Sequence, residues 1–166
     1  FVMADNRGLP DQNCTLFVDP EKRLWLFWIS SLDNEVRSYI LKYRYSTDYE
    51  RDGPPSWTWQ DVLFCRPREA SAGLLRHLEK QRAELQAADH WTAAEKALHL
   101  KVLEERREMR TDKLYQRVGW MSRQPPIMLS DKRMMLGLYS DTFDCAMFAF
   151  TEDAGESWEF SHPLEQ

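Results

Sequence analysis

The chain has 166 residues and a formal net charge of −5 at pH 7, and 43% of its residues are apolar and 30% charged. No apolar run is long enough to span a bilayer, and these residues contain no secretory signal peptide, so they indicate neither a membrane segment nor a compartment. The acidic balance disfavours a nucleic-acid partner, because proteins that bind phosphate backbones carry clustered positive charge.

Four strands are expected in the first part of the chain, near residues 14–19, 23–30, 36–46 and 58–65. The first two are separated by the polar turn DPEKR at residues 19–23, which is followed by a strongly apolar run. The third partly alternates, with Tyr39, Leu41, Tyr43 and Tyr45 on one face, as a strand with period two requires.

The middle of the chain, residues 68–117, changes character and predicts an inserted pair of antiparallel helices. This segment holds 11 of the 22 Lys and Arg residues, no proline and one glycine. Apolar residues at helical spacing predict the first helix, and residues 86–91 form the connection. Thr92 and Glu95 form a capping box that starts a second helix, expected to run to about Leu114. The charged run at 104–110 is interpreted as a solvated helix face because its signs are mixed.

A second group of four strands is expected near residues 126–129, 133–140, 144–151 and 158–162. The run CAMFAF at residues 145–150 is continuously apolar. Such a run is typical of a strand that is covered on both faces.

No cysteine or histidine cluster has the spacing of a metal site. Cys14, Cys65 and Cys145 are expected to be buried thiols, and a disulfide with one cysteine left over is the alternative. The four histidines are scattered, and no phosphate-binding glycine loop or serine nucleophile elbow is present. We therefore expect neither a metal nor a cofactor.

The segment TEDAGESW at residues 151–158 predicts a tight turn between two strands. Thr151 and Asp153 can bond nearby backbone N–H groups through their side-chain oxygens. Gly155 supplies a positive φ, and Trp158 is a large apolar anchor. A stretched version of the same pattern occurs earlier in the chain, at Ser46, Asp48, Gly53 and Trp57.

The two versions of this turn belong to an internal repeat. The segments at 19–28 and 130–139 each place a polar turn before an apolar strand, and a further strand and one copy of the turn follow each of them. With the turn pattern Ser/Thr-x-Asp-x-Gly-x-x-Trp, the repeat resembles the Asp-box, or BNR-repeat, family of bacterial sialidase-like β-propellers. The resemblance covers about residues 5–67 and 117–164.

The resemblance implies a mainly β fold with two antiparallel four-stranded blades of a six-bladed propeller. Residues 1–67 would form the first blade with its leading loop, 68–117 the helical insertion, and 118–166 the second blade. Propellers close with four to eight blades, so two blades would be part of a larger propeller whose remaining blades lie elsewhere. Unpaired edges would otherwise be an aggregation liability.

Successive turns of an antiparallel blade alternate between two ends of the sheet. The boxes and the turns at 19–23 and 130–133 therefore belong at one end, and residues 5–13, 30–35, 120–125 and 140–144 at the other. In sialidase-like propellers the substrate cleft lies at this second end. The box aspartates Asp48 and Asp153 are therefore expected to be structural.

The resemblance implies that the second end holds the site residues. Arg123 is predicted to bind a substrate carboxylate, because guanidinium matches a carboxylate bidentately; an ion pair that holds its loop is the alternative. Asp141 is predicted to be a general acid or an acceptor for a sugar hydroxyl, with a turn cap as the alternative. Arg123 and Asp141 are thus the predicted catalytic residues. The predicted substrate-binding residues are Asp11, Gln12, Asn13, Trp120, Tyr139 and Ser140.

The implied function is that of a sialidase-like glycoside hydrolase, exo-acting on a terminal sugar of a glycan, in a secreted or periplasmic protein. The alternatives are a non-catalytic carbohydrate-binding propeller and a polysaccharide lyase on the same scaffold. The family mechanism requires a tyrosine nucleophile with a glutamate partner, an aspartate acid/base and three arginines. This chain offers no assignable Tyr/Glu pair and no clearly placed second or third arginine, which are expected in the remaining blades.

Overall fold

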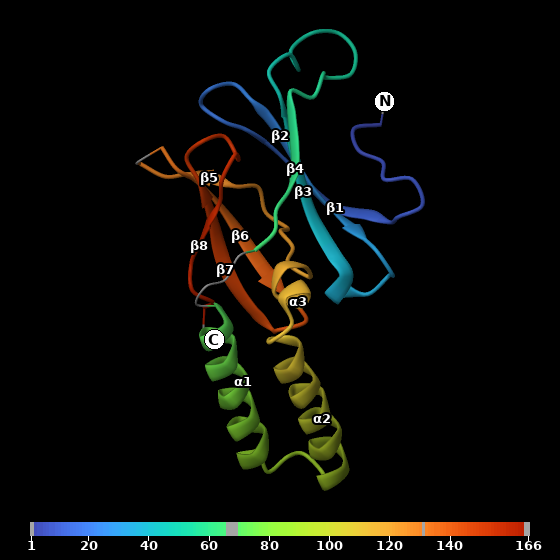
Figure 1. Cartoon of the computed structure of the whole chain (residues 1–166), viewed down its shortest axis with the longest axis vertical. Helices are drawn as coiled ribbons and strands as arrows, with labels where there is room; N and C mark the ends of the chain where they lie inside the picture. Colours follow the sequence, from blue (N-terminus) through green and yellow to red (C-terminus); the bar gives the residue numbers. More distant parts are fainter. Residues whose placement is uncertain (1, 66–69, 131, 165–166) are drawn as a thin grey trace.

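The computed structural model describes residues 2–65, 70–130 and 132–164. It contains two antiparallel four-stranded sheets whose strands lie in chain order (Figure 1). The first sheet is formed by β1 (Asp11–Val18), β2 (Leu24–Ser31), β3 (Tyr39–Ser46) and β4 (Trp59–Val62), with a short 3-10 helix, Val36–Ser38, before β3. The second is formed by β5 (Ile127–Met128), β6 (Met134–Ser140), β7 (Cys145–Thr151) and β8 (Glu159–Phe160). All eight predicted strands are therefore confirmed, although β4, β5 and β8 are shorter than expected.

The segment between the sheets forms two antiparallel helices, α1 (Ala70–Ala87) and α2 (Ala93–Met109), which project away from both sheets (Figure 1). Both bonds of the capping box are present: Thr92 Oγ1 accepts from the Glu95 N–H, and the Glu95 carboxylate accepts from the Thr92 N–H. No described helix is long and apolar enough to cross a lipid bilayer.

The expectation that the second helix runs on to Leu114 is wrong. It ends at Met109, and a separate short helix, α3 (Lys113–Arg117), follows. The break lies at Asp112, which has an extended backbone and whose carboxylate accepts a hydrogen bond of 2.7 Å from the Leu114 N–H. Asp112 therefore acts as a new N-cap, and the chain turns back toward the sheets.

The first turn of each sheet has the same geometry. In the first sheet the Asp19 N–H donates to the Arg23 carbonyl over 3.1 Å, and in the second the Leu129 N–H donates to the Arg133 carbonyl over 2.8 Å. The residue three positions after Asp19, Lys22, has a left-handed backbone with φ 59°. The residue three positions after Leu129, Lys132, likewise has φ 70°. The described positions of the two turns therefore correspond, which equates β2 with β6 and β3 with β7.

With this equivalence, the two sheets pack head to tail. The first sheet contributes Trp25, Phe27 and Ile29 to the shared core, and the second contributes Met134, Leu136 and Leu138. Trp25 is equivalent to Met135, whereas Met134 is equivalent to Leu24. Opposite faces of equivalent sheets therefore meet, an arrangement that has no two-fold symmetry.

Each sheet leaves its other face without a sheet partner among the described residues. On the first sheet Leu16 and Val18 are about half exposed, while Arg44 lies over the buried Trp28 ring. On β7 the side chains of Phe148 and Phe150 are only half-buried. The expectation that both faces of this strand are covered is therefore wrong for the structure described.

Candidate functional site

The predicted box turn at residues 151–158 is held by its polar side chains. Thr151 Oγ1 donates to Asp153 Oδ1 over 2.8 Å and accepts from the Gly155 N–H over 2.9 Å. The Ser157 N–H donates to Asp153 Oδ1 over 2.9 Å. Partial burial opposes ionisation, but the bonds from Ser157 and Thr151 outweigh it and lower the pKa of Asp153. These bonds occupy the Asp153 carboxylate, so they fit the structural role that the resemblance implies.

The stretched box repeats the same carboxylate bonds. Ser46 Oγ donates to Asp48 Oδ1 over 2.7 Å, and the Ser56 N–H donates to the same oxygen over 2.8 Å. These two partners lower the pKa of Asp48. Gly53 has φ 96°, and the Trp57 ring lies 4.0 Å from the Arg44 guanidinium instead of packing between the sheets.

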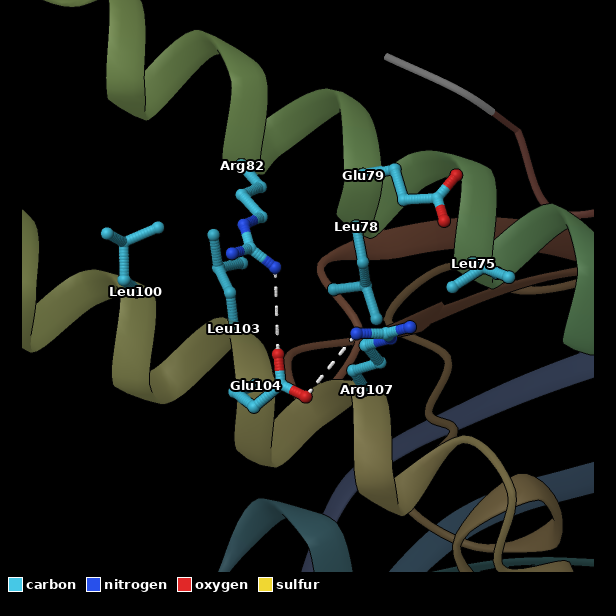
Figure 2. A pocket seen from close by; sticks show the side chains of 8 residues that line it. All are labelled: Leu75, Leu78, Glu79, Arg82, Leu100, Leu103, Glu104 and Arg107. Carbon is cyan, nitrogen blue, oxygen red and sulfur yellow. Dashed lines mark hydrogen bonds and ion pairs between the residues drawn. The ribbon is translucent and has the colours of Figure 1, made fainter.

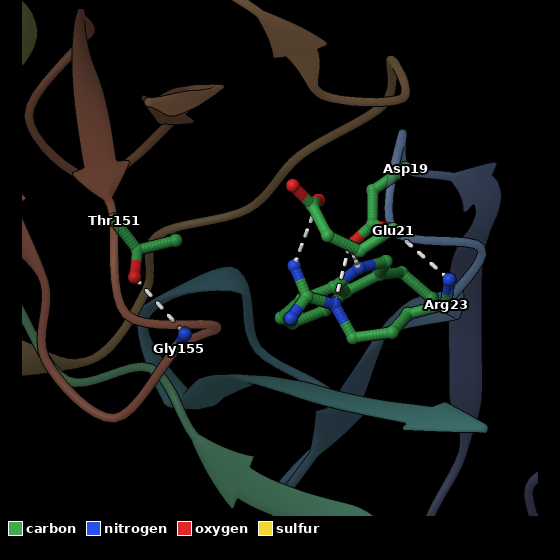
Figure 3. A network of polar contacts seen from close by, with 6 residues as sticks. Asp19, Glu21, Arg23, Thr151 and Gly155 are labelled. Atoms are coloured by element: carbon green, nitrogen blue, oxygen red, sulfur yellow. Dashed lines mark hydrogen bonds and ion pairs between the residues drawn. The ribbon is translucent and has the colours of Figure 1, made fainter. Parts of the chain in front are cut away.

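The compact box also joins the two sheets. The Tyr43 hydroxyl of β3 donates to the Gly155 carbonyl over 2.5 Å, and the Trp158 ring lies edge-on to Tyr43 at 5.4 Å. Burial of the Tyr43 hydroxyl raises its pKa. Figure 3 shows the Thr151–Gly155 bond beside the turn of the first sheet, where Arg23 Nε donates to the buried Asp19 over 2.5 Å.

The turns lie at two ends of the sheets, as the alternation rule predicts. The two boxes and the β1–β2 turn lie at one end, and the β2–β3 and β6–β7 turns lie at the other, next to the helices (Figure 1). The seven residues of β7 separate Asp141 from Asp153, a span of about 20 Å for an extended strand. Asp141 therefore lies far from the box carboxylate.

Arg123 lies at the same end as Asp141, next to the end of β6. Met121 pairs with Tyr139 as an isolated bridge, which brings the following residues alongside the strand. Arg123 Nε donates to the Tyr139 hydroxyl over 2.5 Å, and its guanidinium lies 5.0 Å from the centre of the Tyr139 ring. Arg123 is exposed and has no ion pair among the described residues, so its other N–H groups can receive a carboxylate.

Asp141 occupies the β6–β7 turn with its side chain exposed to solvent. Its backbone carbonyl accepts a hydrogen bond of 3.2 Å from Arg106 of α2. No described side chain bonds its carboxylate, which leaves the group open to a ligand hydroxyl.

The residues of the β1 segment have mixed environments. Asp11 accepts bonds from the Ser30 hydroxyl over 2.5 Å and the Asn6 N–H over 2.6 Å, so its carboxylate is engaged inside the protein. Asn13 has φ 51° where the pairing of β1 with β2 shifts register. Gln12 is exposed. All three belong to β1 and not to a loop that precedes it.

Two residues predicted to bind substrate are enclosed by the protein. Trp120 is 1% exposed, and its indole N–H donates to the Gln116 carbonyl over 3.0 Å. Ser140 is also 1% exposed, and its hydroxyl accepts from the Phe143 N–H within the β6–β7 turn. Trp120 packs into the core because α3 ends just before it and its ring meets Phe143.

The helices contribute residues that the sequence patterns did not single out. Gln81 of α1 donates to the Asp144 carboxylate over 2.8 Å, and Arg106 of α2 reaches Asp141. Both helices therefore contact the β6–β7 turn. Their charge pattern is that of a solvated helix pair and gives no signal for this contact.

A groove of about 180 Å³ runs between α1 and α2 (Figure 2). Its floor consists of leucines such as Leu78 and Leu103. At its rim the Glu104 carboxylate forms ion pairs with the guanidinium groups of Arg82, at 3.8 Å, and Arg107, at 3.5 Å. Exposed ion pairs of this kind add little stability to the helix pair.

The described residues include no group of three or more His, Cys, Asp or Glu side chains that could hold a metal ion. All three cysteines are free thiols, and the expectation that they are buried is correct for Cys65 and Cys145 but wrong for Cys14. Burial raises the pKa of Cys145 to about 12 and that of Cys65 well above its usual range.

Comparison with known proteins found no match to this chain among protein-family models or among curated proteins.

Proposed function

We propose that this chain supplies two blades of a sialidase-like β-propeller that hydrolyses a terminal acidic sugar from a glycan. The head-to-tail packing supports the architecture, because it can continue from blade to blade around a ring. Each sheet has one half-exposed face equivalent to a face that is buried in the other sheet, so further blades have surfaces on which to pack.

The observation that carries the functional proposal is the exposure of the Arg123 side chain and its contact with Tyr139. Arg123 is exposed, has no ion pair with the described residues, and is fixed by Tyr139 at the end of the sheet away from the Asp-boxes. A fixed guanidinium with free N–H groups is the preferred partner of a carboxylate such as that of a sialic acid. Asp141, at the same sheet end, is the acid/base or hydroxyl-accepting group of this proposal.

A non-hydrolytic carbohydrate-binding propeller is the second candidate, and one contact favours it. Tyr139 bonds to Arg123, whereas a tyrosine nucleophile of the sialidase type needs a glutamate partner. Unless another blade supplies a Tyr/Glu pair, the described residues can bind an acidic sugar but have no group to attack it.

Release of fluorophore from a fluorogenic sialoside by the full-length protein tests this proposal. Arg123→Ala should lower kcat/KM by about ten- to a hundredfold, because hydrogen bonds to a charged group are worth about 1.5–3 kcal/mol. Arg51→Ala is the matched control, since Arg51 is exposed at the box end and its partners among the described residues, Asp48 and Ser56, belong to its own loop. Sialic acid binding that requires Arg123, without turnover of a broad sialoside panel, would favour the binding protein. Equal activity of the two variants would refute both.

A further inference from the structure

A further cavity lies on the helical pair and not on the sheets. It has a volume of about 520 Å³ and runs between α1 and α2 from the connection at their tip to Asp144 of the β6–β7 turn. This volume falls in the range of small-molecule sites. From Gln81 to Ala88 the helix rises about 10 Å, which is enough for more than one sugar ring.

An aromatic platform closes the tip end of this cavity. The Trp91 ring is half-buried and is held edge-on by His99 at 4.4 Å, and His90 lies 5.5 Å away on the connection. Neither imidazole nor the Trp91 indole N–H has a hydrogen-bond partner among the described residues. The floor behind the platform is apolar, formed by Leu85, Val102 and Leu103 together with Ala88.

Polar groups with free bonding capacity line the other end. The buried Gln81 Oε1 accepts no hydrogen bond from any described residue, although the amide nitrogen of the same side chain is used by Asp144. Arg106 uses one N–H for the Asp141 carbonyl and keeps others. Glu84 adds a second carboxylate to the lining.

This lining mixes donors and acceptors along its length. Arg106 and the two imidazoles can donate, and Gln81 Oε1, Glu84 and Asp144 can accept. An ion of either sign would meet a like charge in the cavity. A hydroxyl group both donates and accepts, and an aromatic face beside such groups accommodates a ring with an apolar side. The chemistry thus fits a neutral sugar.

We infer that this cavity is a subsite for neutral sugar rings of the glycan whose acidic terminal sugar binds at Arg123. The inference rests on the proposed function, and it extends the substrate class from a terminal sugar to an acidic oligosaccharide. The β6–β7 turn connects the cavity with the predicted site at Arg123 and Asp141. Asp144 of this turn lines the cavity, and Arg106, which also lines it, donates a hydrogen bond to the Asp141 carbonyl. The helical insertion is then the part of the protein that selects the chain behind the terminal sugar.

Titration calorimetry with separate probes tests this subsite. The neutral probes are lactose, cellobiose and chitobiose, and the acidic probes are methyl sialoside and 3′-sialyllactose. We expect at least one neutral disaccharide to bind, and Trp91→Ala to weaken it and 3′-sialyllactose at least tenfold. Trp91→Phe keeps an aromatic face and should retain most of the affinity. Leu98→Ala is the control, because Leu98 is 64% exposed on α2 and does not line the cavity.

The outcomes separate the two proposals. Binding of acidic probes that needs Arg123 but is unaffected by Trp91→Ala, with no neutral disaccharide bound, overturns the subsite and leaves the proposed function. A neutral disaccharide that binds through Trp91, with no binding of methyl sialoside, supports the subsite and refutes the acidic-sugar function. If no probe binds, both are refuted. Circular dichroism of each variant must match that of the unchanged protein. If Trp91→Ala unfolds the helices, binding of the neutral disaccharides by the unchanged protein still tests the subsite.

Discussion

Asp153 is the residue whose hydrogen bonds hold the compact box closed, and removal of its side chain tests that role. Asp153→Ala leaves the Ser157 N–H and the Thr151 hydroxyl without their acceptor. We expect the free energy of unfolding to fall by about 1–2 kcal/mol in chemical denaturation, since the box is partly exposed. Asp52→Ala removes an exposed carboxylate that bonds to no described residue, and it should change stability by less than about 0.5 kcal/mol. Equal losses in the two variants would contradict this role.

The same carboxylate predicts a pH dependence. The pKa of Asp153 in the folded protein is lowered from its ordinary value of 3.8. A lowered pKa gives stability that is fully present above the unfolded-state pKa and is lost as pH falls through the folded-state value. The melting temperature should therefore fall from about pH 4 downward, and Asp153→Ala should flatten part of that fall. A variant curve parallel to that of the unchanged protein would be evidence against it.

The three thiols should differ in reactivity because Cys14 is exposed whereas Cys65 and Cys145 are buried. Thiolate is the reactive form, and the pKa of Cys145 is raised to about 12 by burial, with that of Cys65 also raised. Iodoacetamide at pH 8 should therefore label Cys14 in the folded protein and all three cysteines after denaturation. Mass spectrometry of the labelled peptides measures this, and rapid labelling of Cys145 in the folded state would show that the core opens.

At the scale of single elements, α2 depends on its cap more than on packing. No residue of α2 is buried, so its stability comes from local interactions and a few contacts with α1. Thr92→Ala removes the acceptor for the Glu95 N–H and should cost about 1 kcal/mol of helix stability, seen as faster amide exchange along α2. Thr92→Ser keeps the hydroxyl and should behave like the unchanged protein. Unchanged exchange in Thr92→Ala would mean that α1 alone holds the helix.

The sequence predicted elements well wherever the signal was local. Turn residues, strand alternation and the Thr92–Glu95 pair located eight strands and the start of α2. The end of that helix was missed because no glycine or proline marks it, and an aspartate at position 112 is a cap only in the backbone conformation found there. In the candidate site, the placement of Arg123 and Asp141 at the same end of the sheet was predicted from the alternation of turns between its two ends. The burial of Trp120 and the helix contacts of Gln81 and Arg106 depend on how the insertion folds back, which no local pattern specifies.

At the scale of the whole molecule, the two sheets are joined at Gly155. A Cβ atom at Gly155 would lie 2.8 Å from Tyr43 Cε2 and 3.4 Å from the Trp25 ring, at a backbone φ of 86°. Gly53 has a similar φ of 96° with nothing within 4 Å of such an atom. Gly53→Ala should therefore cost only backbone strain, about 1 kcal/mol, whereas Gly155→Ala adds a clash between the sheets and should cost about 3 kcal/mol or more. Equal losses in thermal unfolding would show that the sheets do not depend on this contact.

The two boxes differ in the length of chain that their aspartates enclose. The Asp153 carboxylate accepts a hydrogen bond from the N–H of Ser157, four residues later. The Asp48 carboxylate accepts the same kind of bond from the N–H of Ser56, eight residues later. The extra residues of the longer loop lie between the two bonded residues and are mostly exposed. The hydrogen bond thus fixes the two ends of each loop, and the number of residues between them can differ. The stretch between Asp48 and Ser56 is therefore a natural place to graft a peptide tag, an epitope or a labelling sequence without disturbing the sheet below.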